Sequence, residues 1–162
     1  MTPLVLGVAG AVVLLDAVSK FFAVRSLTDR APVELLGGAL TLHLIRNPGA
    51  AFGFAQGATA IFTLVALVVV VAILRLARRL RSTPWAIALG LVLGGALGNL
   101  LDRLFRSPGL GRGHVVDFLE LPHWPIFNLA DSSIVCAAVL MVLLSARGVS
   151  YDGQTAAREN PR

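Results

Sequence analysis

The sequence is poor in charged side chains. Charged residues make up 14% of its 162 positions and hydrophobic residues 56%, whereas soluble domains carry about 25% charged residues. A water-soluble domain of this size has too little interior to hide so much apolar surface. The low charge content therefore excludes an ordinary soluble domain, and lipid is expected to be the solvent for most of the chain.

Cysteine and lysine each occur once. The single cysteine, Cys136, lies in an apolar run and excludes an internal disulfide, so we interpret it as a small buried hydrophobic residue. Lys20 is the only lysine, and the net charge of +5 therefore comes from arginine. Because these charges lie mostly between hydrophobic segments, they indicate orientation in a membrane rather than binding to nucleic acid.

The sequence also lacks a recognisable metal-binding motif. The spacings of His43, His114 and His123 match no motif in which two ligands share a helix face or a turn. We therefore expect no metal site.

Four hydrophobic segments are long enough to cross a bilayer, which requires about 20 apolar residues per helix. They lie at about residues 3–24, 58–76, 84–104 and 131–146. The sequence thus predicts an all-α membrane protein with four transmembrane helices. One domain is expected over residues 1–147, followed by a polar, disordered tail over residues 148–162.

Positive charge concentrates between the second and third segments. Four arginines crowd into this link: Arg75, Arg78, Arg79 and Arg81. Because short cytoplasmic loops carry the excess of Lys and Arg, both termini are expected in the cytoplasm and the other two links outside. The first outer link contains two strand-like runs at residues 32–36 and 40–45 with two glycines between them, which predicts a small extracytoplasmic β-sheet.

Polar residues of the apolar segments gather at one depth in this topology. They come from three segments and an outer link: Asp16, Lys20, Asn99, Asp102, Arg103, Asp117 and Asp131. An ionisable group inside a membrane is costly unless it is paired or hydrated. Asp16 with Lys20, and Asp102 with Arg103, can therefore be structural ion pairs. Asn99 can be a hydrogen-bonding bridge between helices.

Asp117 and Asp131 have apolar neighbours and no basic residue within two positions. Asp131 has a structural alternative as a helix N-cap, whereas Asp117 has none. If the two carboxyl groups meet, their repulsion raises one pKa and they titrate as a pair that shares one proton. Aspartic proteases use such a pair, with one Asp as general base on water and the other as general acid.

Five segments resemble, in order, the motifs of lipoprotein signal peptidase (signal peptidase II), a family of bacterial membrane aspartic proteases. They lie at residues 16–20, 47–53, 94–103, 113–118 and 127–132. By this resemblance Asp117 and Asp131 form the catalytic dyad. Seven further motif residues are expected to bind substrate or support the site: Asp16, Lys20, Asn47, Asn99, Asp102, Arg103 and Asn128.

The resemblance implies removal of signal peptides from prolipoproteins, with cleavage just before a cysteine that carries a diacylglyceryl group. It implies an enzyme of the bacterial cell membrane that needs no metal or organic cofactor and is inhibited by globomycin. We expect a monomer, with the site towards the extracytoplasmic face. Only 13 residues separate Asp117 from Asp131, so a mobile lid would come from the first outer link instead.

Two other functions are compatible with charges inside a membrane. A proton-coupled carrier is disfavoured because the sequence shows no internal repeat and its polar groups lie towards one surface. A non-catalytic anchoring subunit would explain the glycines of the third segment but not the two isolated aspartates.

Overall fold

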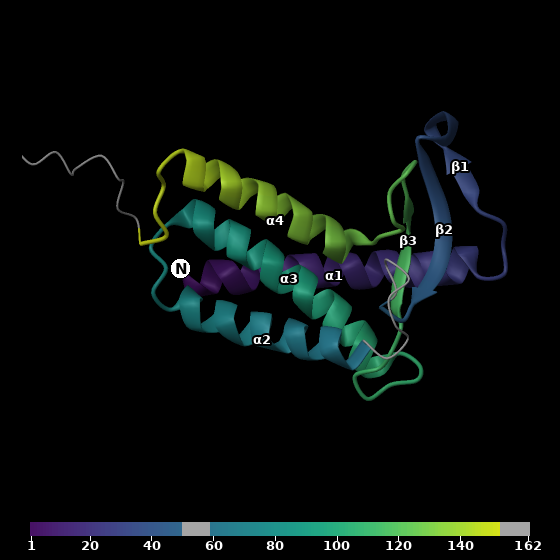
Figure 1. Cartoon of the computed structure of the whole chain (residues 1–162), viewed down its shortest axis with the longest axis horizontal. Helices are drawn as coiled ribbons and strands as arrows, with labels where there is room; N and C mark the ends of the chain where they lie inside the picture. The colour runs from purple at the N-terminus through teal and green to yellow at the C-terminus, as the bar shows by residue number, and fades with distance from the viewer. Residues whose placement is uncertain (50–58, 153–162) are drawn as a thin grey trace, which may run out of the picture.

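The computed structural model describes residues 1–49 and 59–152, and within them four long helices and a three-stranded sheet (Figure 1). The elements are α1 (Thr2–Leu27), β1 (Val33–Leu35), the short 3-10 helix η1 (Leu36–Gly38), β2 (Leu40–Asn47), α2 (Thr59–Ala77), α3 (Thr83–Phe105), β3 (Val115–Glu120) and α4 (Leu129–Ala146). All four α-helices are long and apolar enough to cross a membrane. The predicted four-helix membrane architecture is confirmed.

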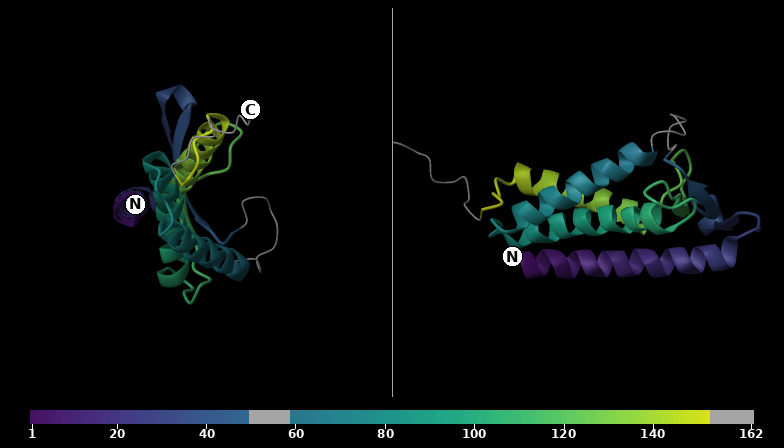
Figure 2. Two further views of the ribbon diagram at one scale, coloured as in Figure 1. Left: turned by 90° about the vertical axis from the view of Figure 1, so that its left-hand side faces the viewer. Right: turned by 90° about the horizontal axis from the view of Figure 1, so that it is seen from below.

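Helix α3 lies at the centre of the bundle and contacts α1, α2 and α4 (Figure 2). Its glycines explain this position. A Cβ atom on Gly94 would lie 2.6 Å from Val12 of α1, and one on Gly95 would lie 2.5 Å from the carbonyl oxygen of Ala130 in α4. Because lipid is as apolar as the helices, association in a bilayer depends on such close packing. The glycine-rich sequence therefore lets two helices approach α3 from different sides.

The sheet has the antiparallel order β1-β2-β3. Strands β1 and β2 confirm the hairpin predicted in the first link, and Gly37 between them has the positive φ of 66° that a tight turn requires. The prediction that the sheet lies wholly in that link was wrong. Strand β3 comes from the link between α3 and α4 and pairs with β2.

The sheet packs on the C-terminal end of α1, where Ala23 and Leu27 contact Val116 and Phe118 of β3. Successive side chains of a strand point to opposite faces. Asp117 therefore points away from α1, and its carboxylate meets the side chain of Asn128 at the start of α4. The strand thus holds a carboxylate where the helices end.

The other end of the bundle receives the chain after α4. The Trp85 indole nitrogen donates to the carbonyl oxygen of Val149 at 2.7 Å. The backbone nitrogen of Arg81 donates to the carbonyl oxygen of Tyr151 at 3.1 Å. The sequence predicts a disordered tail from residue 148, but these bonds attach its first residues to the bundle. Residues 153–162 lie outside those that the structure describes.

Candidate active site

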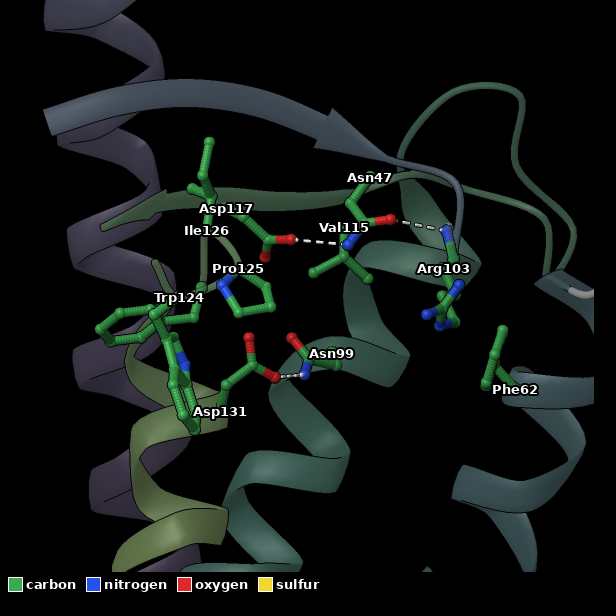
Figure 3. A pocket seen from close by; sticks show the side chains of 12 residues that line it. Asn47, Phe62, Asn99, Arg103, Val115, Asp117, Trp124, Pro125, Ile126 and Asp131 are labelled. Atoms are coloured by element: carbon green, nitrogen blue, oxygen red, sulfur yellow. Dashed lines mark hydrogen bonds between the residues drawn. The ribbon is translucent and has the colours of Figure 1, made fainter. Parts of the chain in front are cut away.

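A pocket of about 270 Å³ lies between the sheet and the adjoining ends of α2, α3 and α4 (Figure 3). Asp117 reaches it from β3 and Asp131 from α4, on opposite sides (Figure 3). Its polar lining is completed by Asn47, Asn99 and Arg103. The pocket therefore collects, from two strands and two helices, five of the residues that the sequence singles out.

Asp117 is only 2% exposed, yet both of its carboxylate oxygens accept hydrogen bonds. Asn47 lies on β2 opposite Val115, so its side chain shares a face with Asp117, two residues along β3. The Asn47 amide nitrogen donates to Oδ2 at 2.8 Å, and that of Asn128 donates to Oδ1 at 2.7 Å. Two neutral amides thus satisfy a carboxylate that water hardly reaches.

Asp131 occupies the third position of α4 in a capping box. The Asn128 side chain accepts from the backbone nitrogen of Asp131 at 2.9 Å, and Oδ2 of Asp131 accepts from the backbone nitrogen of Asn128 at 3.2 Å. The alternative role of Asp131 as the N-cap is wrong, because Asn128 is the cap. Oδ1 of Asp131 accepts from the Asn99 amide at 2.7 Å, and the helix N-terminus favours its negative charge.

Asn99 and Asn128 connect the two carboxylates. The Asn99 oxygen accepts from the Lys20 ammonium and from the Asn128 amide, both at 3.1 Å. These bonds determine the orientation of both side-chain amides. The amide nitrogen of Asn99 must face Asp131, and the amide nitrogen of Asn128 must face Asp117. The network directs a donor at each carboxylate.

A group of paired charges lies beneath this network, and we call it the ionic cluster: Asp16, Lys20, Asp102 and Arg106. Lys20 is 1% exposed, and its ammonium lies 2.7 Å from Oδ2 of Asp16 and 2.9 Å from Oδ2 of Asp102. The other partner of Asp102 is Arg106, four residues later and just past the end of α3. Each charge has a partner, as burial requires.

The ionic cluster also anchors the two elements that bear the pocket's aspartates. Oδ1 of Asp16 accepts from the backbone nitrogen of Ala130 at 3.0 Å, in the first turn of α4. Oδ2 of Asp102 accepts from the backbone nitrogen of Val116 at 3.1 Å, next to Asp117. The cluster therefore sets the positions of α4 and β3 relative to α1 and α3.

Arg103 does not form the ion pair with Asp102 that the sequence left open. Its guanidinium lies over the ring of Phe62, 5.6 Å from the centroid, on the side of the pocket opposite Trp124 (Figure 3). Nη1 of Arg103 is buried and has no hydrogen-bond partner within the described part of the chain. Arg103 thus presents an unused donor and a positive charge at the pocket.

Burial raises the pKa of Asp117 to about 6, and the negative charge of Asp131 acts in the same direction. The amides of Asn47 and Asn128, and the positive charge of Lys20, oppose this rise by favouring the ionised form. A carboxyl group with a pKa near 6 can hold a proton or release it under physiological conditions. A carboxyl group of this kind thus lies in the same pocket as Asp131.

Comparison with known proteins assigns this arrangement to a family. The family model described as "Signal peptidase (SPase) II" matches residues 8–147. The chain belongs to the signal peptidase II family. It is 53% identical over 146 residues to a lipoprotein signal peptidase of Rhodococcus jostii, covering 90% of this chain and 74% of the relative. Identity to a lipoprotein signal peptidase of Streptomyces coelicolor is 56% over 140 residues, or 86% and 69% of the two chains.

Solved structures of this fold belong to bacterial membrane enzymes. One matches with a TM-score of 0.76 at 27% identity and covers 87% of this chain and 91% of its own. A second matches with a TM-score of 0.77 at 26% identity and covers 98% of this chain and 93% of its own. As a signal peptidase II, the chain is a multi-pass membrane protease, and this disfavours the carrier and the anchoring subunit.

The structure brings all nine of the predicted site residues into one connected region. The sequence analysis missed Arg106, whose position four residues after Asp102 is a helical pairing signal. It also missed the apolar walls of the pocket, formed in part by Phe62, Trp124 and Phe127. Residues 50–53 of the second motif lie outside the described residues, as do residues 50–57 of the first outer link, which was expected to supply a lid.

Proposed function

We propose that this chain is an aspartic endopeptidase that removes signal peptides from prolipoproteins and cleaves just before a cysteine carrying a diacylglyceryl group. The relatives named above are lipoprotein signal peptidases. One observation supports the mechanism most directly. Asp117 and Asp131 come from different elements, line the same pocket, and are held there by amide side chains.

In the proposed reaction the two aspartates share one proton. The ionised carboxylate removes a proton from a water molecule between them, and the water oxygen attacks the scissile carbonyl carbon. The protonated carboxyl donates to the carbonyl oxygen as the tetrahedral intermediate forms. When the C–N bond breaks, the proton taken from water passes to the leaving amine. Arg103, whose positive charge lies at the pocket, stabilises the negative charge that develops on the substrate.

The proposed topology places this reaction at the extracytoplasmic face of the bacterial cell membrane. The four arginines of the α2–α3 link lie at the end of the bundle away from the sheet and the pocket (Figure 1). The excess of positive charge in short cytoplasmic loops puts that end, and both termini, in the cytoplasm. Residues 1–147 would form one protease domain that acts as a monomer, with the remaining tail in the cytoplasm.

A cleavage assay with two matched substrates tests this function. The purified protein in lipid bilayers is mixed with a prolipoprotein whose cysteine carries diacylglycerol, and separately with the same precursor without the lipid. We expect cleavage before the cysteine of the lipidated form only, identified by mass spectrometry and inhibited by globomycin. Equal cleavage of both precursors, or of neither, would contradict the proposal.

A further inference from the structure

A second cavity adjoins the pocket, on the face of α4 that turns away from α3. We call it the α4 groove and define it by five apolar residues: Leu121, Trp124, Phe127, Val135 and Cys136. It measures about 360 Å³ and is also bordered by Asp131 and Ser132. Trp124 is 60% exposed and Val135 is 54% exposed, so the groove opens towards the lipid.

The α4 groove is continuous with the pocket of the two aspartates. Trp124, Phe127 and Asp131 line both cavities, and Trp124 stands beside Asp131 in Figure 3. From Asp131 the groove follows α4 to Cys136, a rise of about 7.5 Å along the helix towards the bilayer interior. It therefore connects the aspartates to the hydrocarbon region.

The outer wall of the groove is firmly held. Leu119 and Phe127 exchange two backbone hydrogen bonds, each from one residue's nitrogen to the other's oxygen, at 2.9 Å. The backbone nitrogen of Trp124 donates to the carbonyl oxygen of Leu121 at 3.1 Å within the same link. The short connection between β3 and α4 is thus a closed turn, and the groove is largely pre-formed, as ligand sites usually are.

We propose that the α4 groove binds one acyl chain of the diacylglyceryl group on the substrate cysteine. The inference rests on the proposed function and extends it by assigning a site to the lipid. Only a few bonds separate the scissile carbonyl from the glycerol of the adjacent cysteine. When the scissile bond lies between Asp117 and Asp131, the acyl chains must therefore leave the pocket close to Asp131 and enter hydrocarbon, and the groove provides that path.

The physical role of the groove is alignment more than affinity. An acyl chain that moves from the bilayer into an apolar groove gains little from the hydrophobic effect, because both surroundings are apolar. It gains contacts with side chains of fixed shape, and these position the cysteine along α4. Filling the groove should therefore weaken productive binding of long-chain substrates while the aspartates remain intact.

Substitutions that fill the groove provide the first test. Cys136→Trp and Val135→Trp are compared with Leu14→Trp, a control on the 64% exposed, lipid-facing surface of α1. Substrates are diacylglyceryl peptides with long and with short acyl chains. We expect wild type and the control to prefer long chains. In the two groove variants kcat/KM for the long-chain substrate should fall about tenfold or more, with short-chain cleavage unchanged.

These outcomes separate the two proposals. If wild type cleaves neither peptide, the proposed function fails. If wild type cleaves both peptides equally well, or if the groove variants keep the wild-type preference for long chains, the function stands and the groove assignment is overturned.

Cys136 supplies a second test that does not depend on cleavage. It is the only cysteine of the chain, and the prediction that it is buried was wrong, because it is exposed on α4. A membrane-permeant maleimide therefore labels one position. The labelling rate is measured in Asp117→Asn protein in bilayers. We expect the long-chain diacylglyceryl peptide to slow labelling several-fold, and the short-chain peptide to leave the rate unchanged. Equal protection by free long-chain diacylglycerol, which carries no peptide, would show a general lipid groove and overturn the assignment.

Discussion

Buried carboxylates occur in two neighbouring environments of this molecule. In the ionic cluster, Asp16 and Asp102 lie within 2.9 Å of the Lys20 ammonium, and Arg106 also pairs with Asp102. In the pocket, Asp117 and Asp131 receive hydrogen bonds from asparagine amides. None of the salt bridges among the described residues includes either of these two aspartates.

The two environments differ in what accompanies each buried carboxylate: cations in the ionic cluster and neutral amides in the pocket. A cation at contact distance strongly favours the charged form of its partner. An amide donor favours the charged form less, so burial and the neighbouring carboxylate can still raise the pKa, as they do for Asp117. We infer that the ionic cluster is a scaffold and that the amide-held pair does the chemistry.

The largest effect is expected when either pocket aspartate is replaced by asparagine, which has the same shape but cannot ionise. Asp117→Asn or Asp131→Asn should lower cleavage of a lipidated precursor by about 10³-fold or more, because neither variant can share a proton between two carboxyl groups. Both proteins should remain folded in the membrane, as judged by thermal unfolding in detergent. Near-wild-type cleavage by either variant would remove that residue from the proposed dyad.

Substitutions in the ionic cluster should lower the stability of the protein, unlike the substitutions in the pocket. Lys20→Met leaves two buried carboxylates short of a cation, and breaking a buried pair in this manner costs about 3–5 kcal/mol. Thermal unfolding should reveal this loss. The double variant Asp16→Asn with Lys20→Met removes one negative charge as well and should recover part of the stability. A Lys20→Met protein as stable as wild type would show that the cluster is not a scaffold.

The pH dependence of cleavage tests the amide-held pair directly. Because the pKa of Asp117 is raised to about 6, the free enzyme loses the shared proton as pH rises through that value, and kcat/KM should fall above it. Asn47→Ala removes a donor to the ionised form, so it should move this decline to higher pH. His43→Gln is the control, because His43 pairs with Glu120 on the sheet and does not line the pocket.

The contrast between the two environments could be predicted only in part from the sequence. The spacing of Asp16 and Lys20 predicts their ion pair, and the four spans follow from hydropathy alone. Strand β3 was missed because its first four residues are all buried, so the alternation that identifies a half-exposed strand is absent. The fold of the helices was therefore predictable and the third strand was not.

The residues of the site, too, could be predicted only in part from the sequence. Asn128 and Asp131 have the spacing of a capping box, and this pattern marks the start of α4. By contrast, Phe62 and Trp124 resemble the many other apolar residues of a chain that faces lipid, and nothing in the sequence separates pocket walls from lipid contacts. That distinction depends on how the link between β3 and α4 folds against its neighbours.

The smallest effect is expected within the ionic cluster itself. Arg106 pairs with the same carboxylate as Lys20, but its side chain is 31% exposed, and partly hydrated pairs contribute little. Arg106→Gln should therefore lower the free energy of unfolding by less than about 1 kcal/mol. Adding Arg106→Gln to Lys20→Met takes the last cation from Asp102, so the combined loss in thermal unfolding should exceed the sum of the single losses. Strictly additive losses would mean that the two cations do not act on a shared carboxylate.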